Sequence, residues 1–363
     1  MNYIGSKLSI LNFVKDSINK TLELSNDKRN ANQMIFADLF AGTGIVGASF
    51  KKEGYKVISN DIQYYSYILN KHIIENNEEL KFDGICLFFP EISKLSSVER
   101  VFFILKFLEN LEGKEGFIYN NYCYGGTKDS ENPRIYFSDE NGKKVDSIRE
   151  TIEVWYNKNW IIENEYFFLL ASLIDSIDRY ANTASVYGAF LKKLKKSAQK
   201  KLELKPYHST IINNQNNTVF NLDINKLIKT IKGDILYLDP PYNHRQYATN
   251  YHLLETIAKY DFPKIKGKTG LREYEEQKSL YCSKNNAVEI FEDLINNANF
   301  KYIFLSYNDE GIISIEEIER IFSKKGKYIR FEMDYKRFKA DKDENRNHAK
   351  TSTIEYLHCL TVN

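Results

Sequence analysis

The fold of this chain is decided by the stretch Met34-Ile35-Phe36-Ala37-Asp38-Leu39-Phe40-Ala41-Gly42-Thr43-Gly44. Its first six residues, Met34 to Leu39, have the composition of a short buried strand, and the glycines that follow predict a tight turn. A helical pattern continues from Ile45 to about Gly54, and a second strand is predicted over Tyr55–Ser59, ending at Asn60-Asp61. A strand, a glycine-rich turn, a helix and a strand begin a βαβ unit, which predicts a parallel sheet.

The same pattern of short apolar segments returns far downstream. Three more strands are predicted over 217–222, 234–238 and 301–306, and two alternating segments over 328–335 and 353–361 predict an antiparallel hairpin. We therefore predict an α/β, Rossmann-like fold with a mostly parallel twisted sheet and an antiparallel C-terminal hairpin.

The region between the two groups of strands differs in character, because its apolar residues recur at helical spacing. We interpret it as a mainly helical inserted domain with its own core. The predicted boundaries are 1–75 and 213–363 for the sheet-forming domain and 76–212 for the insertion.

Composition limits the class of protein. With 363 residues and 42% hydrophobic residues, the chain buries a sizeable core and exceeds one ordinary domain. Its formal net charge of +2 neither demands nor excludes nucleic acid. No secretory signal and no uncharged apolar stretch of about 18 residues is visible, so no membrane association is expected. The cysteines lie far apart without CxxC spacing, which favours reduced thiols in a cytoplasmic protein and gives no support for a metal site.

The turn at Gly42 and Gly44 is a candidate ligand site. Glycines let a backbone approach a ligand closely, and a helix N-terminus presents free amides and partial positive charge. Asp61 follows roughly 20 residues later, where dinucleotide folds place the carboxylate that binds ribose. The turn lacks a third glycine and the Gly-Lys-Ser/Thr of a phosphate loop, so neither a nicotinamide cofactor nor a nucleoside triphosphate is favoured. From these residues alone, an ordinary tight turn stays the alternative.

A second candidate site is the tetrapeptide Asp239-Pro240-Pro241-Tyr242, which directly follows a buried strand. Open α/β sheets bind ligands at the carboxyl ends of their strands. The two prolines fix the backbone, so that a carboxylate, a rigid carbonyl and an aromatic face lie close together. This combination suits an exocyclic amine on a flat base, whose N–H groups are accepted by oxygen while Tyr242 stacks on the ring. The alternative is a Pro-Pro turn with a capping Asp and a packing Tyr.

These motifs, in this order, resemble those of the S-adenosylmethionine-dependent DNA adenine methyltransferases of the D12 class. Tyr3-Ile4-Gly5-Ser6-Lys7 is similar to the first motif of that family, and the glycine motif, an insertion and Asp-Pro-Pro-Tyr then follow as in its alpha group. The resemblance covers roughly 1–75 and 213–363. It implies a class I methyltransferase domain, with the insertion as the target-recognition domain that binds DNA.

The resemblance also implies a cofactor site. Tyr3 and Lys7 would contact the methionine part of S-adenosyl-L-methionine or close over it, and Asp61 would hold the ribose hydroxyls. Asp223 matches the position that meets the adenine amino group of the cofactor, although it also suits the cap of a helix over 224–231. The residues implied in cofactor binding are Tyr3, Lys7, Asp38, Phe40, Gly42, Gly44, Asp61 and Asp223, with Asp38 and the glycines at the amino-acid end.

The implied activity is that of a site-specific, adenine-specific DNA methyltransferase. Asp239, Pro240, Pro241 and Tyr242 would be its catalytic residues, acting on the amino nitrogen of an adenine flipped out of duplex DNA, in a restriction-modification or epigenetic role. Double-stranded DNA is the expected partner, a cognate restriction endonuclease a candidate one, and a single chain carries every motif, so we expect a monomer. The alternatives are an amino methyltransferase for RNA adenine, cytosine or protein glutamine, and a non-catalytic DNA-binding module.

Two basic segments are candidates for phosphate contacts. The lysines of the first lie along a predicted helix within 192–201, and such a run taken alone is more typical of a solvated helix face. The second spans 337–350 in the loop of the predicted terminal hairpin, where alternating acids weaken the case.

Overall fold

The computed structural model describes residues 5–336 and 352–363. These residues form two compact units. The sheet unit comprises 5–70, 211–247, 276–336 and 352–363, and the helical unit comprises 71–210 and 248–275.

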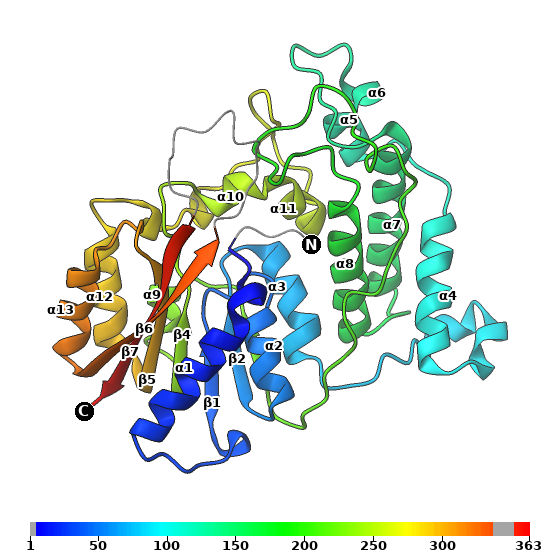
Figure 1. Ribbon diagram of the computed structural model, residues 1–363. Coiled ribbons are helices and arrows are strands. Elements are labelled where there is room, and N and C mark those ends of the chain that lie inside the picture. Colours follow the sequence, from blue (N-terminus) through cyan, green and yellow to red (C-terminus); the bar gives the residue numbers. More distant parts are fainter. Residues whose placement is uncertain (1–4, 337–351) are drawn as a thin grey trace. The chain divides into compact units, whose positions relative to one another are not determined.

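The sheet unit is built on one seven-stranded sheet (Figure 1). Its first five strands are parallel, and the last two join antiparallel, so that the predicted parallel sheet and terminal hairpin are confirmed. Strand order reverses between the neighbours β1 and β4, and such switch points place ligand sites at the carboxyl ends of the strands. In spatial order the strands are β3 (Thr218–Phe220), β2 (Lys56–Asn60), β1 (Ile35–Asp38), β4 (Lys232–Leu238), β5 (Asn299–Asn308), β7 (Ser352–Val362) and β6 (Gly326–Lys336).

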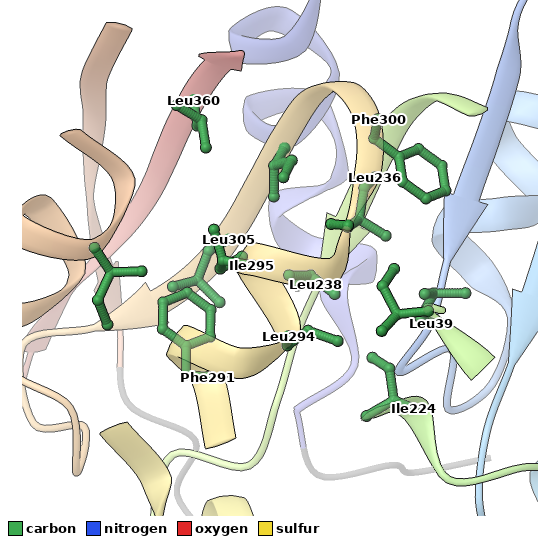
Figure 2. Packing of buried hydrophobic residues seen from close by; sticks show 14 of the residues in the cluster. Leu39, Ile224, Leu236, Leu238, Phe291, Leu294, Ile295, Phe300, Leu305 and Leu360 are labelled. Carbon is green, nitrogen blue, oxygen red and sulfur yellow. The ribbon is translucent and has the colours of Figure 1, made fainter. Parts of the chain in front are cut away.

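Alternate residues of the central strands point to opposite faces, and each face is covered by helices. On one face Leu236, Leu238 and Leu305 pack against α9 (Ile224–Leu227), α12 (Ala287–Asn297) and α13 (Ile315–Ser323), as Figure 2 shows for part of this core. On the other face Phe36 of β1 stacks on Phe50 of α2, with ring centroids 3.8 Å apart. The helices on this second side are α1 (Leu11–Leu24), α2 (Ile45–Lys52) and α3 (Tyr64–Asn70).

Truncation of this core gives the first testable prediction. Leu294 of α12 is fully buried, whereas Leu24 at the end of α1 is 61% exposed. We expect Leu294→Ala to lower the free energy of unfolding by about 2–5 kcal/mol, since the cavity adds to the lost transfer energy. Leu24→Ala is the matched control and should change it by less than about 0.5 kcal/mol. Equal effects in denaturant titrations of the two variants would contradict the packing described here.

The helical unit confirms the mainly helical character predicted for the insertion. Its longest helices, α7 and α8, pack together, and their buried residues form much of its core. Its helices are α4 (Ser97–Asn110), α5 (Phe117–Tyr122), α6 (Tyr124–Thr127), α7 (Asp139–Asn157), α8 (Glu163–Asp178) and α11 (His252–Lys259), and α10 (Tyr247–Asn250) spans its boundary.

Several short helical segments complete the two units. In the sheet unit these are η1 (Lys7–Ile10), η2 (Ala31–Gln33) and η7 (Leu280–Cys282), and η6 (Glu275–Gln277) lies at its boundary. The helical unit contributes η3 (Lys71–Glu75), η4 (Ile85–Leu87) and η5 (Pro90–Lys94).

The helical unit extends beyond the predicted insertion, because residues 248–275 group with it. The buried guanidinium of Arg149 donates to the carbonyls of Ile257 and Ala258 at 3.1 and 3.2 Å. The Tyr260 hydroxyl donates to Asp146 at 2.7 Å. These long-range contacts leave no periodic signal in the sequence, and the domain boundaries at 76 and 212 stay a prediction.

The helix predicted over the lysines within 192–201 is wrong, because this segment is irregular and contains only turns. The Asn182 side chain explains this, since its amide nitrogen donates to the Leu191 carbonyl and its oxygen accepts from the Lys195 amide, both at 2.9 Å. The lysines that stay exposed are Lys192, Lys193, Lys196, Lys200 and Lys201.

The second basic segment, 337–350, lies outside the described residues. Within 5–336 and 352–363, no helix is long and apolar enough to cross a membrane.

Candidate active site

The glycine turn and Asp61 are joined directly. Gly42 and Gly44 have φ of +51° and +75°, in the left-handed region that residues other than glycine rarely adopt. This conformation turns the Gly42 amide toward Asp61, whose Oδ2 accepts from it at 2.8 Å. The other oxygen of Asp61 accepts from the Gln63 amide, also at 2.8 Å. The turn is therefore fixed against the end of β2.

A cavity of about 440 Å³ lies at the carboxyl ends of β1, β2 and β3. Phe40 and Tyr281 form part of its wall, with their rings edge to face at 5.2 Å. Asp61 and Asp223 bring carboxylates to it. Asp223 also caps α9, accepting from the Lys226 amide at 3.1 Å, so the structure supports the capping interpretation and places the same residue beside the cavity. The cavity is lined by Leu39, Phe40, Asn60, Asp61, Ile62, Leu222, Asp223, Ile224, Asn225, Lys226, Lys229, Glu276, Lys278, Ser279, Leu280, Tyr281 and Ile290.

Asp38, at the end of β1, is only 1% exposed. Its Oδ2 accepts weakly from the Gly47 amide at 3.3 Å, while its Oδ1 has no hydrogen-bond partner among the described residues. Burial, with the charge of Asp239 as the next cause, raises the pKa of Asp38 to about 8. A buried carboxyl oxygen without a partner suits a ligand that brings a cationic N–H donor.

Asp239 lies in a polar cluster directly beyond β4. The Lys7 ammonium is 3.0 Å from Asp239 Oδ1 and 3.2 Å from Glu355 Oε1. The hydroxyl of Tyr242 lies 2.8 Å from Asp239 Oδ1 and 2.9 Å from the same oxygen of Glu355, and it also accepts a hydrogen bond from Lys7. Ser306 of β5 donates to Glu355 at 2.8 Å. One cation and one hydroxyl are thus shared between two carboxylates.

Burial and charge oppose each other within this cluster. Burial raises the pKa of Asp239 to about 6, with Lys7 lowering it and Glu355 raising it. Burial also disfavours charge on Lys7, but the two carboxylates outweigh it and raise the Lys7 pKa. Burial and the same carboxylates hold the pKa of Tyr242 well above its ordinary value, so its hydroxyl is protonated at neutral pH.

The three residues after Asp239 complete the Asp-Pro-Pro-Tyr motif. Pro240 is buried and Pro241 half-buried. The Tyr242 carbonyl accepts from the Ile312 amide at 3.0 Å, and its ring meets that of Tyr307 edge to face at 5.1 Å. A fixed carboxylate, a rigid carbonyl and a held aromatic ring can bind a planar amine by its N–H groups.

The structure brings together most of the residues singled out in the sequence. Lys7, Asp239 and Tyr242 are in direct contact, while Phe40, Asp61 and Asp223 line the cavity. Tyr3 lies outside the described residues.

Glu355 was not expected from the motifs, although its strand carries a signal for it. Leu357 and Cys359 lie on the same face of β7 as Glu355 and are fully buried. A charged residue on a buried apolar face needs partners, and Lys7 and Ser306 are those partners. Ser306, at the end of the strand predicted over 301–306, contributes its hydroxyl.

Comparison with known proteins gives one consistent family. The model of the D12 class N6 adenine-specific DNA methyltransferases matches residues 3–321. The chain is 51% identical over 361 residues to the Type II methyltransferase M.NlaIII of Neisseria lactamica, covering 99% of both chains. It is 44% identical over 348 residues to the Type II methyltransferase M.FokI of Planomicrobium okeanokoites, covering 94% of this chain and 50% of that relative.

A viral protein is similar as well. The Type II methyltransferase M.CviAII of Paramecium bursaria Chlorella virus 1 is 35% identical over 348 residues, covering 94% of this chain and 93% of that protein. No solved structure matches the chain significantly. The family model spans most of the chain, and two of these relatives match it over nearly their full length. The chain belongs to the D12 class of N6 adenine-specific DNA methyltransferases.

Proposed function

We propose that this protein transfers a methyl group from S-adenosyl-L-methionine to the N6 amino group of an adenine flipped out of duplex DNA, at a specific site. The observation that carries the proposal is the Asp239 cluster. Lys7 and Tyr242 engage Asp239 Oδ1, while no hydrogen bond from residues 5–336 or 352–363 reaches Oδ2. The free oxygen and the Pro240 carbonyl suit the two N–H groups of one planar amine.

The sheet unit offers a site that fits the cofactor. Asp38 Oδ1, buried and without a partner among the described residues, suits the ammonium of the methionine part, and the Gly42–Gly44 turn lets the backbone approach the amino-acid end closely. The cavity beside Asp61, Asp223 and Phe40 suits the ribose and the adenine ring. When bound, S-adenosyl-L-methionine supplies an electrophilic methyl group on a sulfonium.

The residues of this chain act on the attacking nitrogen. The lone pair of an adenine amine is delocalised into the ring, which makes it a poor nucleophile. Hydrogen bonds from both N–H groups to Asp239 and the Pro240 carbonyl favour a more tetrahedral nitrogen, whose lone pair then points along the line of attack. Tyr242 holds the base by ring contact, and one N6 proton leaves after the nitrogen–carbon bond has formed.

The partners follow from the same proposal. We assign target recognition to the helical unit, where exposed lysines suit phosphates. The relatives named Type II methyltransferase or modification methylase support a role in restriction-modification, with a cognate restriction endonuclease as partner. We expect the protein to act as a monomer, since one chain carries every motif together with its own helical unit. The four cysteines are free, in keeping with a cytoplasmic location.

The proposal is tested by incubation with labelled S-adenosyl-L-methionine and unmethylated genomic DNA, followed by nucleoside digestion and chromatography. We expect the label in N6-methyladenine. Parallel incubations with RNA, a protein extract and a duplex whose only amino-bearing base is cytosine should stay unlabelled. Label in a cytosine derivative, in RNA or in protein would overturn the acceptor.

The two roles of Asp223 can be separated by substitution. Serine caps a helix nearly as well as aspartate but is shorter, so Asp223→Ser should keep the stability within about 0.5 kcal/mol. We expect its dissociation constant for S-adenosyl-L-methionine to rise about tenfold, the equivalent of one hydrogen bond. Asp223→Ala should lose a similar affinity and, in addition, about 1 kcal/mol of unfolding free energy. Unchanged affinity in both variants, by calorimetry, would leave Asp223 only as a helix cap.

A further inference from the structure

Glu355 contacts three side chains of the candidate active site and belongs to none of the motifs. It lies on β7, opposite Asn308 of β5 and Met333 of β6. Its side chain is 4% exposed and contacts Lys7, Tyr242 and Ser306. Burying a carboxylate destabilises the fold unless the group is paired and hydrogen-bonded. The role of Glu355 therefore depends on how it affects the side chains that it contacts.

The hydrogen atoms in this cluster can be counted. The Lys7 ammonium has three N–H bonds, and its neighbours are Asp239, Glu355 and the Tyr242 oxygen. The Tyr242 hydroxyl has a single proton, yet both carboxylates lie within hydrogen-bond distance of it. A proton donated to Glu355 is not donated to Asp239. Glu355 therefore competes with Asp239 for the Tyr242 proton and shares the Lys7 ammonium with it.

We propose that Glu355 is a positioning residue that acts through Asp239, drawing the Tyr242 proton and part of the Lys7 charge toward itself so that Asp239 stays a strong hydrogen-bond acceptor for the target amine. The inference rests on the proposed function. Glu355 forms and breaks no covalent bond in this role. Without the charge of Glu355, Lys7 and Tyr242 would both donate hydrogen bonds mainly to Asp239. The Asp239 carboxylate would then bind the target amine more weakly.

The electrostatics of the cluster have the sign that this role requires. Lys7 lowers the pKa of Asp239, and Glu355 raises it. Asp38 also faces Asp239, and its own pKa is raised to about 8, chiefly by burial. Among the described residues, the titratable and polar groups that face the two carboxylates are Lys7 of η1, Asp38 of β1, Tyr237 of β4, Tyr242 beyond β4 and Ser306 of β5.

The test is Glu355→Gln, which removes the charge and keeps the shape and the acceptor for Ser306. The measurement is the single-turnover rate of methyl transfer against pH, at saturating S-adenosyl-L-methionine and duplex DNA. In the wild type we expect the rate to fall below about pH 6, as Asp239 becomes protonated. In the variant we expect a plateau about tenfold lower and a fall displaced downward by about one pH unit, while cofactor affinity stays unchanged.

A matched control is Glu332→Gln on the neighbouring strand β6. Glu332 is exposed and pairs with Tyr356 in the sheet, so its substitution makes the same change of charge outside the cluster. We expect the wild-type plateau and the wild-type pH profile. Should Glu355→Gln lack a cooperative unfolding transition, Glu355→Asp replaces it. Aspartate withdraws the charge by one methylene, so a smaller displacement in the same direction is expected.

The outcomes separate the inference from the proposed function. If Glu355→Gln lowers the plateau but does not move the pH profile, Glu355 has a purely structural role. If the variant keeps both the wild-type plateau and the wild-type profile, Glu355 has no role in the reaction. Either result overturns the inference. If the wild-type protein labels no adenine, the proposed function itself fails. If it labels adenine and the profile of Glu355→Gln does not move downward, only the inference fails.

Discussion

Replacement of Asp239 by alanine is expected to reduce methyl transfer by at least about 10³-fold, because the fixed acceptor for the target amine is lost. The fold should persist, since Lys7 keeps Glu355 as its counter-ion at 3.2 Å. Asp239 does not line the cavity proposed for the cofactor, so the dissociation constant for S-adenosyl-L-methionine should change by less than about threefold. The readouts are transfer to duplex DNA in a single turnover and calorimetric binding of the cofactor.

The matched control is Asp234→Ala, at the opposite end of the same strand. Asp234 accepts from the Ile35 amide at 2.8 Å and pairs with Arg29, away from the carboxyl ends of the strands. This variant should lose some stability and keep the wild-type rate. Substantial methyl transfer by Asp239→Ala would reject the assignment of Asp239, and equal losses of rate in both variants would indicate damage to β4.

Replacement of Lys7 by methionine is expected to have the second largest effect. The ammonium is buried, and its loss leaves Asp239 and Glu355 facing each other without a cation. Removing one partner of a buried ion pair typically costs about 3–5 kcal/mol of stability. The pKa of Asp239, already about 6, should rise further, because Lys7 is the charge that lowers it. The ionised form then prevails only at higher pH, so activity is lost first on the acidic side.

The measurement is the single-turnover rate against pH, with saturating cofactor, beside a denaturant titration. We expect the fall in rate to move above pH 6, so that alkaline buffer partly restores the reaction. Glu355→Gln should move the fall in rate to lower pH, so the two variants are expected to shift the pH profile in opposite directions. Lys52→Met, on an exposed residue at the end of α2, should alter neither quantity. A downward displacement in Lys7→Met would contradict the charge arrangement described above.

The central part of the fold follows from local sequence patterns. The apolar run ending at Asp38, the glycine turn and the alternating terminal segments each act over a few residues, so their periodicity predicts β1, β2 and the β6–β7 hairpin. The lysines within 192–201 have helical spacing as well, but the Asn182 side chain, from outside the segment, binds the backbone of Leu191 and Lys195 instead. Tertiary contacts override propensity there.

The candidate site divides in the same way. Asp239, Tyr242 and Asp61 stand in short motifs at strand ends, where the chemistry can be inferred from spacing. Glu355 stands in no motif, and its role depends on the register that places β7 beside β5. Register is set by the pairing of distant strands, so a single sequence gives only the hint of a charge on an apolar face.

The distance along the chain between Lys7 and Glu355 has a consequence for synthesis. The two residues bond to each other although 348 positions separate them. A ribosome delivers Asp239 before β7, so until the terminal strand is made the proposed acceptor lacks the neighbour that competes for its donors. Closing so long a loop is entropically costly and is favoured only once the terminal strand can pair. Nascent and prematurely terminated chains that lack β7 should therefore not methylate DNA, and methylation should begin only with chains that include this strand.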